Sequence, residues 1–133
     1  MPSPHPRRKL AVLTCMDARI EPLSLLGLEV GDAHIIRNAG GLVTDDAIRS
    51  LSASQSMLDT DEIVLVMHED CGMHGAPLEI GGFDDLEAAL RDGVERLRAS
   101  EELTARDTIR GFVFDPETGA LREVGGTAMS ASE

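Results

Sequence analysis

The sequence predicts an α/β protein with a mainly parallel β-sheet flanked by helices and a C-terminal hairpin strand at the edge of the sheet. Short apolar runs alternate with helical patterns along the chain. The strongest run, residues 62–67 (EIVLVM), is continuously apolar after its first residue, as in a parallel strand covered on both faces. The 133 residues fit one domain, 1–133, and we expect loose tails over residues 1–8 and 125–133.

The first half of the chain predicts two strands and a short helix. Residues 9–14 (KLAVLT) form a short apolar run with β-branched members, which is typical of a buried strand. Residues 20–28 (IEPLSLLGL) predict a short helix, because Pro22 suits a first helical turn. Residues 33–37 (AHIIR) predict the second strand, and residues 38–41 (NAGG) a tight loop.

The next helix has a clear start. Thr44 is a suitable N-cap, and Asp45 and Asp46 suit the positive end of the helix dipole. Apolar residues then follow a roughly helical spacing, and we expect them, Met57 included, in the core. They are Ala47, Ile48, Leu51, Met57 and Leu58. Residues 59–61 (DTD), two of which are acidic, end this pattern before the strand at 62–67.

The second half predicts a loop, a helix and a hairpin. Residues 72–82 contain four glycines and one proline, which indicates a loop. Residues 83–102 predict an amphipathic helix, since their leucines and valine share one face. Residues 109–114 (IRGFVF) predict another strand. After a turn at 115–119 (DPETG), residues 120–124 are expected to pair back onto it.

The composition excludes several classes of function. The 12 Lys and Arg against 24 Asp and Glu give a formal net charge of −12, which argues against nucleic-acid binding. No apolar run approaches the about 20 residues of a membrane span, and the start lacks the apolar stretch of a signal peptide. We therefore expect a cytoplasmic protein with no membrane partner. Its two cysteines should be free or metal-bound rather than paired.

Three metal-binding side chains follow two of the predicted strands. Cys15 comes directly after the first strand, and His68 and Cys71 come after the strongest one. The carboxyl ends of parallel strands meet at one edge of a sheet, where open α/β proteins bind ligands. If these strands are neighbours, two thiolates and one imidazole converge, a set suited to zinc. Each motif alone would favour an ordinary buried thiol or histidine, but their shared position favours a metal.

The fourth zinc position decides between a structural and a catalytic site, because a structural site has four protein ligands and a catalytic one admits water. Asp17 and Arg19 follow Cys15 in the segment CMDAR. Asp17 could bind zinc and close the site. Alternatively, it could pair with Arg19 and accept a hydrogen bond from hydroxide, which zinc makes available near neutral pH. A surface ion pair without function, worth at most about 1 kcal/mol, is a third reading.

Other polar residues lie close to these motifs in sequence or in the second strand. His34 is expected to be a packed or surface histidine rather than a proton shuttle. His74, Glu69 and Asp70 could relay protons from the site. They could equally be solvated loop residues, and the sequence leaves both readings open.

Two short motifs carry the residues with chemistry: Cys15-x-Asp17-x-Arg19 and His68-x-x-Cys71-Gly72. Together with residues 31–40 (GDAHIIRNAG), which separate them, these motifs resemble the β-class carbonic anhydrases. Residues 111–115 (GFVFD) are similar to the final strand of that family.

The resemblance implies reversible hydration of carbon dioxide to bicarbonate and a proton by hydroxide on zinc. It implies zinc ligation by Cys15, His68 and Cys71, and a catalytic pair of Asp17 and Arg19. In that family the equivalent of Asp17 is a fourth ligand in closed forms and turns to the arginine in active ones. The resemblance also implies a homodimer or larger homo-oligomer with the active cleft at the interface.

Three other functions are compatible with the same residues. The first is hydrolysis of carbon disulfide or carbonyl sulfide on the same zinc site. The second is a non-catalytic zinc protein that Asp17 closes permanently. The third is a redox protein in which Cys15 and Cys71 form a disulfide. Activity that rises steeply with pH would indicate that Asp17 can be displaced from the metal.

Overall fold

A computed structural model of the protein describes residues 3–126. Its strands are β1 (Leu10–Cys15), β2 (Ala33–Asn38), β3 (Glu62–His68), β4 (Ile109–Phe114) and β5 (Leu121–Gly126). Its α-helices are α1 (Pro22–Leu26), α2 (Asp45–Leu58) and α3 (Leu86–Arg98), and its 3₁₀ turns are η1 (Ala39–Gly41) and η2 (Leu78–Ile80). The sheet order is β2-β1-β3-β4-β5; only the β4–β5 pair is antiparallel. The predicted α/β fold class, with its hairpin edge strand, is confirmed.

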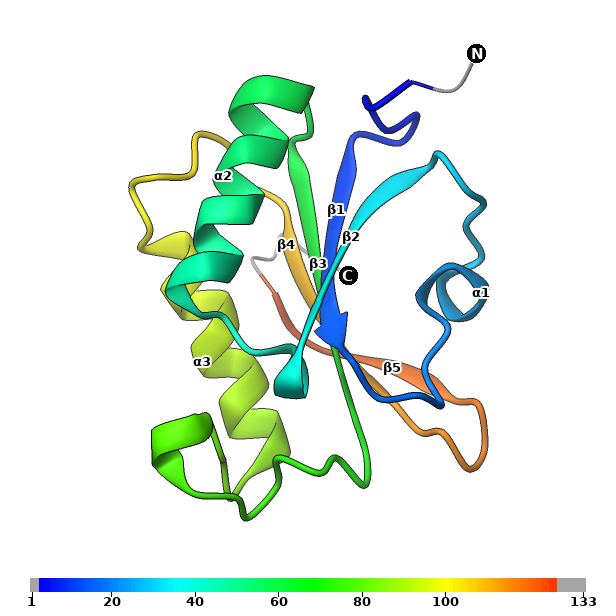
Figure 1. Ribbon diagram of the computed structural model, residues 1–133, viewed down its shortest axis with the longest axis vertical. Helices are drawn as coiled ribbons and strands as arrows, with labels where there is room; N and C mark the ends of the chain where they lie inside the picture. The colour runs from blue at the N-terminus through cyan, green and yellow to red at the C-terminus, as the bar shows by residue number, and fades with distance from the viewer. Residues whose placement is uncertain (1–2, 127–133) are drawn as a thin grey trace.

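The sheet is covered unequally on its two faces. Figure 1 shows α2 and α3 on one face and the short helix α1 on the other. The α2–α3 face carries the main core, which is aliphatic, as the scarcity of aromatic residues requires. Its fully buried members include Leu13, Leu51, Leu65, Leu90 and Leu97. The α1 face has a smaller core of Val12, Val64 and Val66, against which several apolar residues pack while partly exposed.

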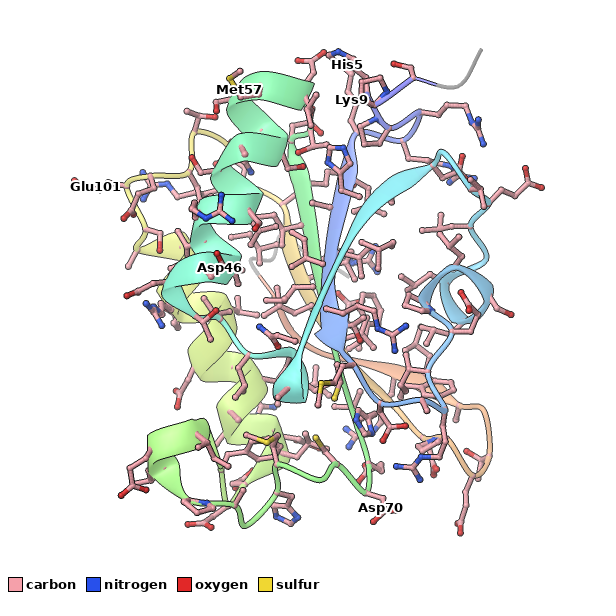
Figure 2. All side chains as sticks on the ribbon, in the orientation of Figure 1. His5, Lys9, Asp46, Met57, Asp70 and Glu101 are labelled. Carbon is pink, nitrogen blue, oxygen red and sulfur yellow. The ribbon has the colours of Figure 1, made fainter. Side chains whose placement is uncertain are left out.

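Helix α2 begins as predicted, but the prediction that Met57 lies in the core is wrong. The Thr44 hydroxyl accepts a hydrogen bond from the Ala47 N–H at 3.1 Å, which caps the helix. Met57 is 73% exposed, near the end of α2 (Figure 2). It lies six residues after the fully buried Leu51, and at about 3.6 residues per turn this spacing turns the side chain away from the core.

Helix α3 is shorter than the predicted range of 83–102. The Asp85 carboxylate accepts a hydrogen bond from the Ala88 N–H at 3.0 Å, so the helix starts after Asp85. Phe83 therefore lies in the preceding loop, where its ring stacks on His74 at a centroid distance of 5.7 Å. An aspartate that caps its own helix makes the helix start later than periodicity alone suggests.

The lead-in before β1 is anchored where the structure describes it, contrary to the expected loose tail. The Arg7 N–H donates to Gly31 O at 2.9 Å, and the Arg8 N–H donates to Asp32 O at 3.0 Å. The Arg7 guanidinium also bonds the Asp32 carboxylate. At the other end, β5 extends to Gly126, and the rest of the expected tail lies outside the described residues. Over residues 3–126, no helix has the length and apolar character to cross a membrane.

Candidate metal centre

The sheet order brings the three predicted ligand residues together. Cys15 is the last residue of β1 and His68 the last residue of β3. These strands are parallel neighbours paired as far as Thr14 and Val66, so their carboxyl ends lie side by side. Cys71 follows in the loop after β3. The two Sγ atoms and a His68 ring nitrogen all lie within 4.8 Å of one another, and all three residues are buried.

The His68 ring is oriented for a metal. Its Nδ1 lies 2.8 Å from the Glu69 carbonyl oxygen, which can only accept a hydrogen bond. Nδ1 therefore carries the proton, and Nε2 presents its lone pair to the cysteines. Nε2 is the single buried side-chain nitrogen or oxygen without a hydrogen-bond partner among residues 3–126. A buried polar atom without a partner is costly, and a metal ion at this position would satisfy it.

Backbone N–H groups support both sulfur atoms. The Gly40 N–H donates to Cys15 Sγ at 3.3 Å, and the Met73 N–H donates to Cys71 Sγ at 3.5 Å. Gly41 allows η1 to approach β1, because a Cβ there would lie 3.0 Å from the Cys15 backbone nitrogen and the φ angle is +65°. The glycine pair of the NAGG segment therefore brings a donor to the Cys15 sulfur.

The two cysteines are free thiols that a cation would favour as thiolates. Burial raises the pKa of the Cys71 thiol; the Met73 N–H partly offsets this rise, and the neighbouring Cys15 adds to it. A divalent cation held by both sulfurs and by His68 would reverse this preference and release the thiol protons. The donor set of two sulfurs and one imidazole matches the preference of zinc.

Asp17 is held beside this cluster by Arg19. The guanidinium donates to Asp17 Oδ1 at 3.0 Å and to Oδ2 at 2.8 Å, and the Arg19 backbone N–H donates to Oδ1 at 2.8 Å. These bonds hold the pKa of Asp17 well below its usual range, so the carboxylate is ionised. Asp17 Oδ2 lies 3.7 Å from His68 Nε2. The carboxylate thus faces Arg19 at the edge of the ligand cluster.

The resemblance to the β-class carbonic anhydrases also implies that Arg37 and the loop after it lie near the site, but the sequence did not reveal what Arg37 bonds. Its guanidinium donates to the carbonyl oxygens of Cys15 at 2.9 Å, Asp17 at 2.9 Å and Ile20 at 3.1 Å. It therefore holds the backbone at Cys15, a candidate ligand, and through the loop that carries Asp17. No side-chain pattern could have indicated this, because all three acceptors are backbone atoms.

The other polar residues near the motifs have structural partners. Both ring nitrogens of His34 are bonded, as expected of a packed histidine. His74 Nε2 bonds the Asp84 carbonyl oxygen, and Glu69 pairs with Arg122. A proton relay through His74 or Glu69 stays a prediction.

A sequence model of carbonic anhydrase matches residues 10–111. The β-carbonic anhydrase 1 of Mycobacterium tuberculosis is 40% identical over 141 residues, covering 93% of this chain and 86% of its own. The chain belongs to the β-carbonic anhydrase family. The solved carbonic anhydrase of Streptococcus mutans matches with a TM-score of 0.85 and 38% identity, over 91% of this chain and 84% of its own. A carbon disulfide hydrolase of Acidithiobacillus thiooxidans is 33% identical over 86% of this chain and 76% of its own.

Proposed function

We propose that this β-carbonic anhydrase family member catalyses the zinc-dependent, reversible hydration of carbon dioxide to bicarbonate and a proton. The observation that carries the proposal is the buried Cys15–His68–Cys71 cluster with its unpartnered Nε2. Asp17, ionised and bonded to Arg19, lies beside this cluster. The named relatives with the same fold include carbonic anhydrases from two bacteria.

The proposed zinc ligands are Cys15, His68 and Cys71. Their donor atoms lie within 4.8 Å of one another, and a zinc ion held by three protein ligands would admit water. Zinc, when bound there, supplies a Lewis acid that activates water near neutral pH. The N–H groups of Gly40 and Met73 would stabilise the charge on the two sulfurs.

Asp17 has the proposed task of orienting the nucleophile. Its carboxylate can accept a hydrogen bond from a water at the cluster and so direct a lone pair of that water to the carbon of carbon dioxide. Arg19 holds the carboxylate for this task by two side-chain hydrogen bonds. If Arg19 released it, Asp17 could turn to the cluster and act as a fourth ligand, as in the closed state that the resemblance implies.

Carbon disulfide hydrolysis is the second candidate function. The carbon disulfide hydrolase of Acidithiobacillus thiooxidans, 33% identical to this chain, supports it. Both reactions add water to a small linear electrophile, and the same ligand cluster could serve either. Turnover measured on carbon dioxide, carbon disulfide and carbonyl sulfide with one zinc-loaded sample separates them. We expect carbon dioxide to be the fastest of the three.

A homodimer in the cytoplasm is also part of the proposal. The α1 face of the sheet carries an apolar groove of about 290 Å³, with leucines and Phe112 in its lining. Met16, which follows Cys15 in the chain, is a further apolar side chain that is 65% exposed. A second copy would bury such surface. Light scattering should give twice the 14.2 kDa of the chain, and a monomer at working concentration would contradict the dimer.

Stopped-flow carbon dioxide hydration, with zinc measured on the same reduced sample, tests the main proposal. We expect about one zinc per chain and activity that rises between about pH 6.5 and about pH 9. Because Asp17 is ionised throughout this range, such a rise would report on the water at the metal and its competition with Asp17. Bound zinc without hydration would favour a permanently closed site, and less than about half a zinc per chain would contradict the metal centre.

A further inference from the structure

We propose that Asp70 is a positioning residue for the reaction, because it fixes the guanidinium of Arg19 from the second ligand loop. The Asp17–Arg19 pair then becomes a bridge of three residues, Asp17–Arg19–Asp70. This bridge joins the loop after β1, which follows Cys15, to the loop after β3, which carries Cys71. The inference rests on the proposed function for its catalytic consequence, and its geometry stands independently.

Arg19 is bonded on two sides. Toward the first loop it donates to both carboxylate oxygens of Asp17. Toward the second loop, Nη1 donates to Asp70 Oδ2 at 3.2 Å and Nη2 donates to the Asp70 carbonyl oxygen at 3.0 Å. Figure 2 shows Asp70 in the loop beyond the carboxyl end of β3. Four side-chain hydrogen bonds therefore hold a guanidinium that is otherwise half exposed.

The backbone of Asp70 has a conformation that no helix end requires. Its φ is +57°, in the left-handed region, where aspartate is one of the few tolerated residues besides glycine. Asp59 has a similar φ of +74°, but it lies at the C-cap of α2, where this conformation is common. At Asp70 the same conformation accompanies a carbonyl and a carboxylate that both bond Arg19.

A fixed Arg19 keeps the Asp17 carboxylate turned from the metal. Without the Asp70 carboxylate, the guanidinium keeps only the backbone acceptor on the second loop and can move toward solvent. Asp17 would then be held less firmly and would turn to the cluster more often. The expected result is slower hydration, expressed mainly in kcat because Asp70 acts through Arg19 and Asp17.

Two variants separate the side chain from the backbone. Asp70→Gly keeps the left-handed conformation and the carbonyl acceptor but removes the carboxylate. Asp70→Asn keeps an acceptor oxygen and tolerates the same φ but removes the charge. Asp59→Gly is the matched control, since it replaces the same residue type at a similar φ away from Arg19.

The decisive readout is the hydrogen-exchange rate of the Arg19 Nε–H, followed by nitrogen-15 NMR in the zinc-loaded protein. We expect Asp70→Gly to raise this rate about 1.5- to 5-fold and to lower kcat by a similar factor, as for one exposed charged bond. Asp70→Asn should recover part of both losses. Asp59→Gly should change neither.

An Arg19 exchange rate in Asp70→Gly equal to that of Asp59→Gly would overturn the inference. Faster hydration in Asp70→Gly would also overturn it, since Asp70 would then compete with Asp17 for Arg19. If the unaltered protein hydrates no carbon dioxide, the proposed function fails. The exchange rates would still decide whether Asp70 fixes Arg19, so the two failures are distinguishable.

Discussion

Two histidines at opposite ends of the sheet differ in how their ring nitrogens are bonded. His34, near the start of β2, has Nδ1 2.6 Å from the Ser54 hydroxyl and Nε2 2.8 Å from the Pro4 carbonyl oxygen. His68, at the end of β3, has a partner for Nδ1 only, and its Nε2 is buried without one. A fully bonded ring stabilises the fold, whereas a buried ring atom without a partner marks a ligand site.

Two aspartates repeat this contrast. The buried Asp32 accepts hydrogen bonds from the Glu29 N–H and from Arg7, so it anchors the lead-in to the turn before β2. Asp17 is also held by an arginine, but it lies 3.7 Å from the unpartnered His68 nitrogen. An aspartate–arginine pair therefore anchors the lead-in at the amino end of the sheet. A second such pair, at the carboxyl end, holds the carboxylate that could close the candidate metal site.

Loss of a candidate ligand should produce the largest effect. His68→Ala and Cys15→Ser should each reduce zinc from about one per chain to near zero, because too few donors remain. Hydration should fall by more than about 100-fold, beyond the loss typical of outer-shell changes. Metal analysis and stopped-flow assay of the purified variants measure both. A zinc-loaded, active Cys15→Ser protein would refute Cys15 as a ligand.

Asp17→Asn should separate the proposed role of Asp17 in hydration from zinc binding by the candidate ligands. The amide has one acceptor oxygen and no charge, so it pairs poorly with Arg19 and orients water less well. We expect zinc to stay at about one per chain while hydration falls about 10- to 100-fold. Zinc content and kcat measured on the same sample provide the test. Full activity would assign the ion pair to the surface reading, with no catalytic role.

His34→Ala should lower the stability of the fold, whereas His68→Ala should remove zinc and activity. It removes one of the two side-chain partners of the Ser54 hydroxyl and the ring that bonds the Pro4 carbonyl, so the free energy of unfolding should fall by about 1 to 3 kcal/mol. Zinc content and kcat at 25 °C should be unchanged. Urea unfolding of the zinc-loaded protein measures the stability. Zinc loss in this variant would contradict the division between the two ends of the sheet.

Asp32→Asn should give the smallest effect, confined to stability and dependent on pH. The Glu29 N–H, with Arg7 adding to it, lowers the pKa of Asp32 in the folded protein. A lowered folded pKa adds stability above the unfolded value of about 3.9, and this stability is lost as pH falls through the folded pKa. The variant should unfold at lower urea at neutral pH, and its difference from the unaltered protein should shrink below about pH 4.

Urea midpoints at stepped pH for both proteins test this prediction. Any zinc lost in acid affects the two proteins alike, so their difference isolates Asp32. A difference that grows as pH falls would mean that the folded pKa is raised. Hydration at neutral pH should be the same in both proteins.

The local patterns of the sequence were sufficient for the fold class and for the convergence of the candidate ligands. The continuous apolar run of β3 predicted a central parallel strand, and the Thr44 cap located the start of α2. Cys15 and His68 end their strands, so the meeting of their side chains required only that β1 and β3 be neighbours. Patterns failed where one residue decided the outcome, as with the cap at Asp85 and the exposed side chain of Met57.

The sequence by itself determined the candidate site residues, because donor type and position after a strand are properties of the chain. Only the tertiary structure decided their bonding: the free Nε2 of His68, the three carbonyls held by Arg37 and the tie from Arg19 to Asp70. The reason is physical. Several of these partners are backbone atoms, which every residue type presents alike, and Arg19 and Asp70 are 51 residues apart in the chain. Their selection depends on how the loops pack once the sheet has formed.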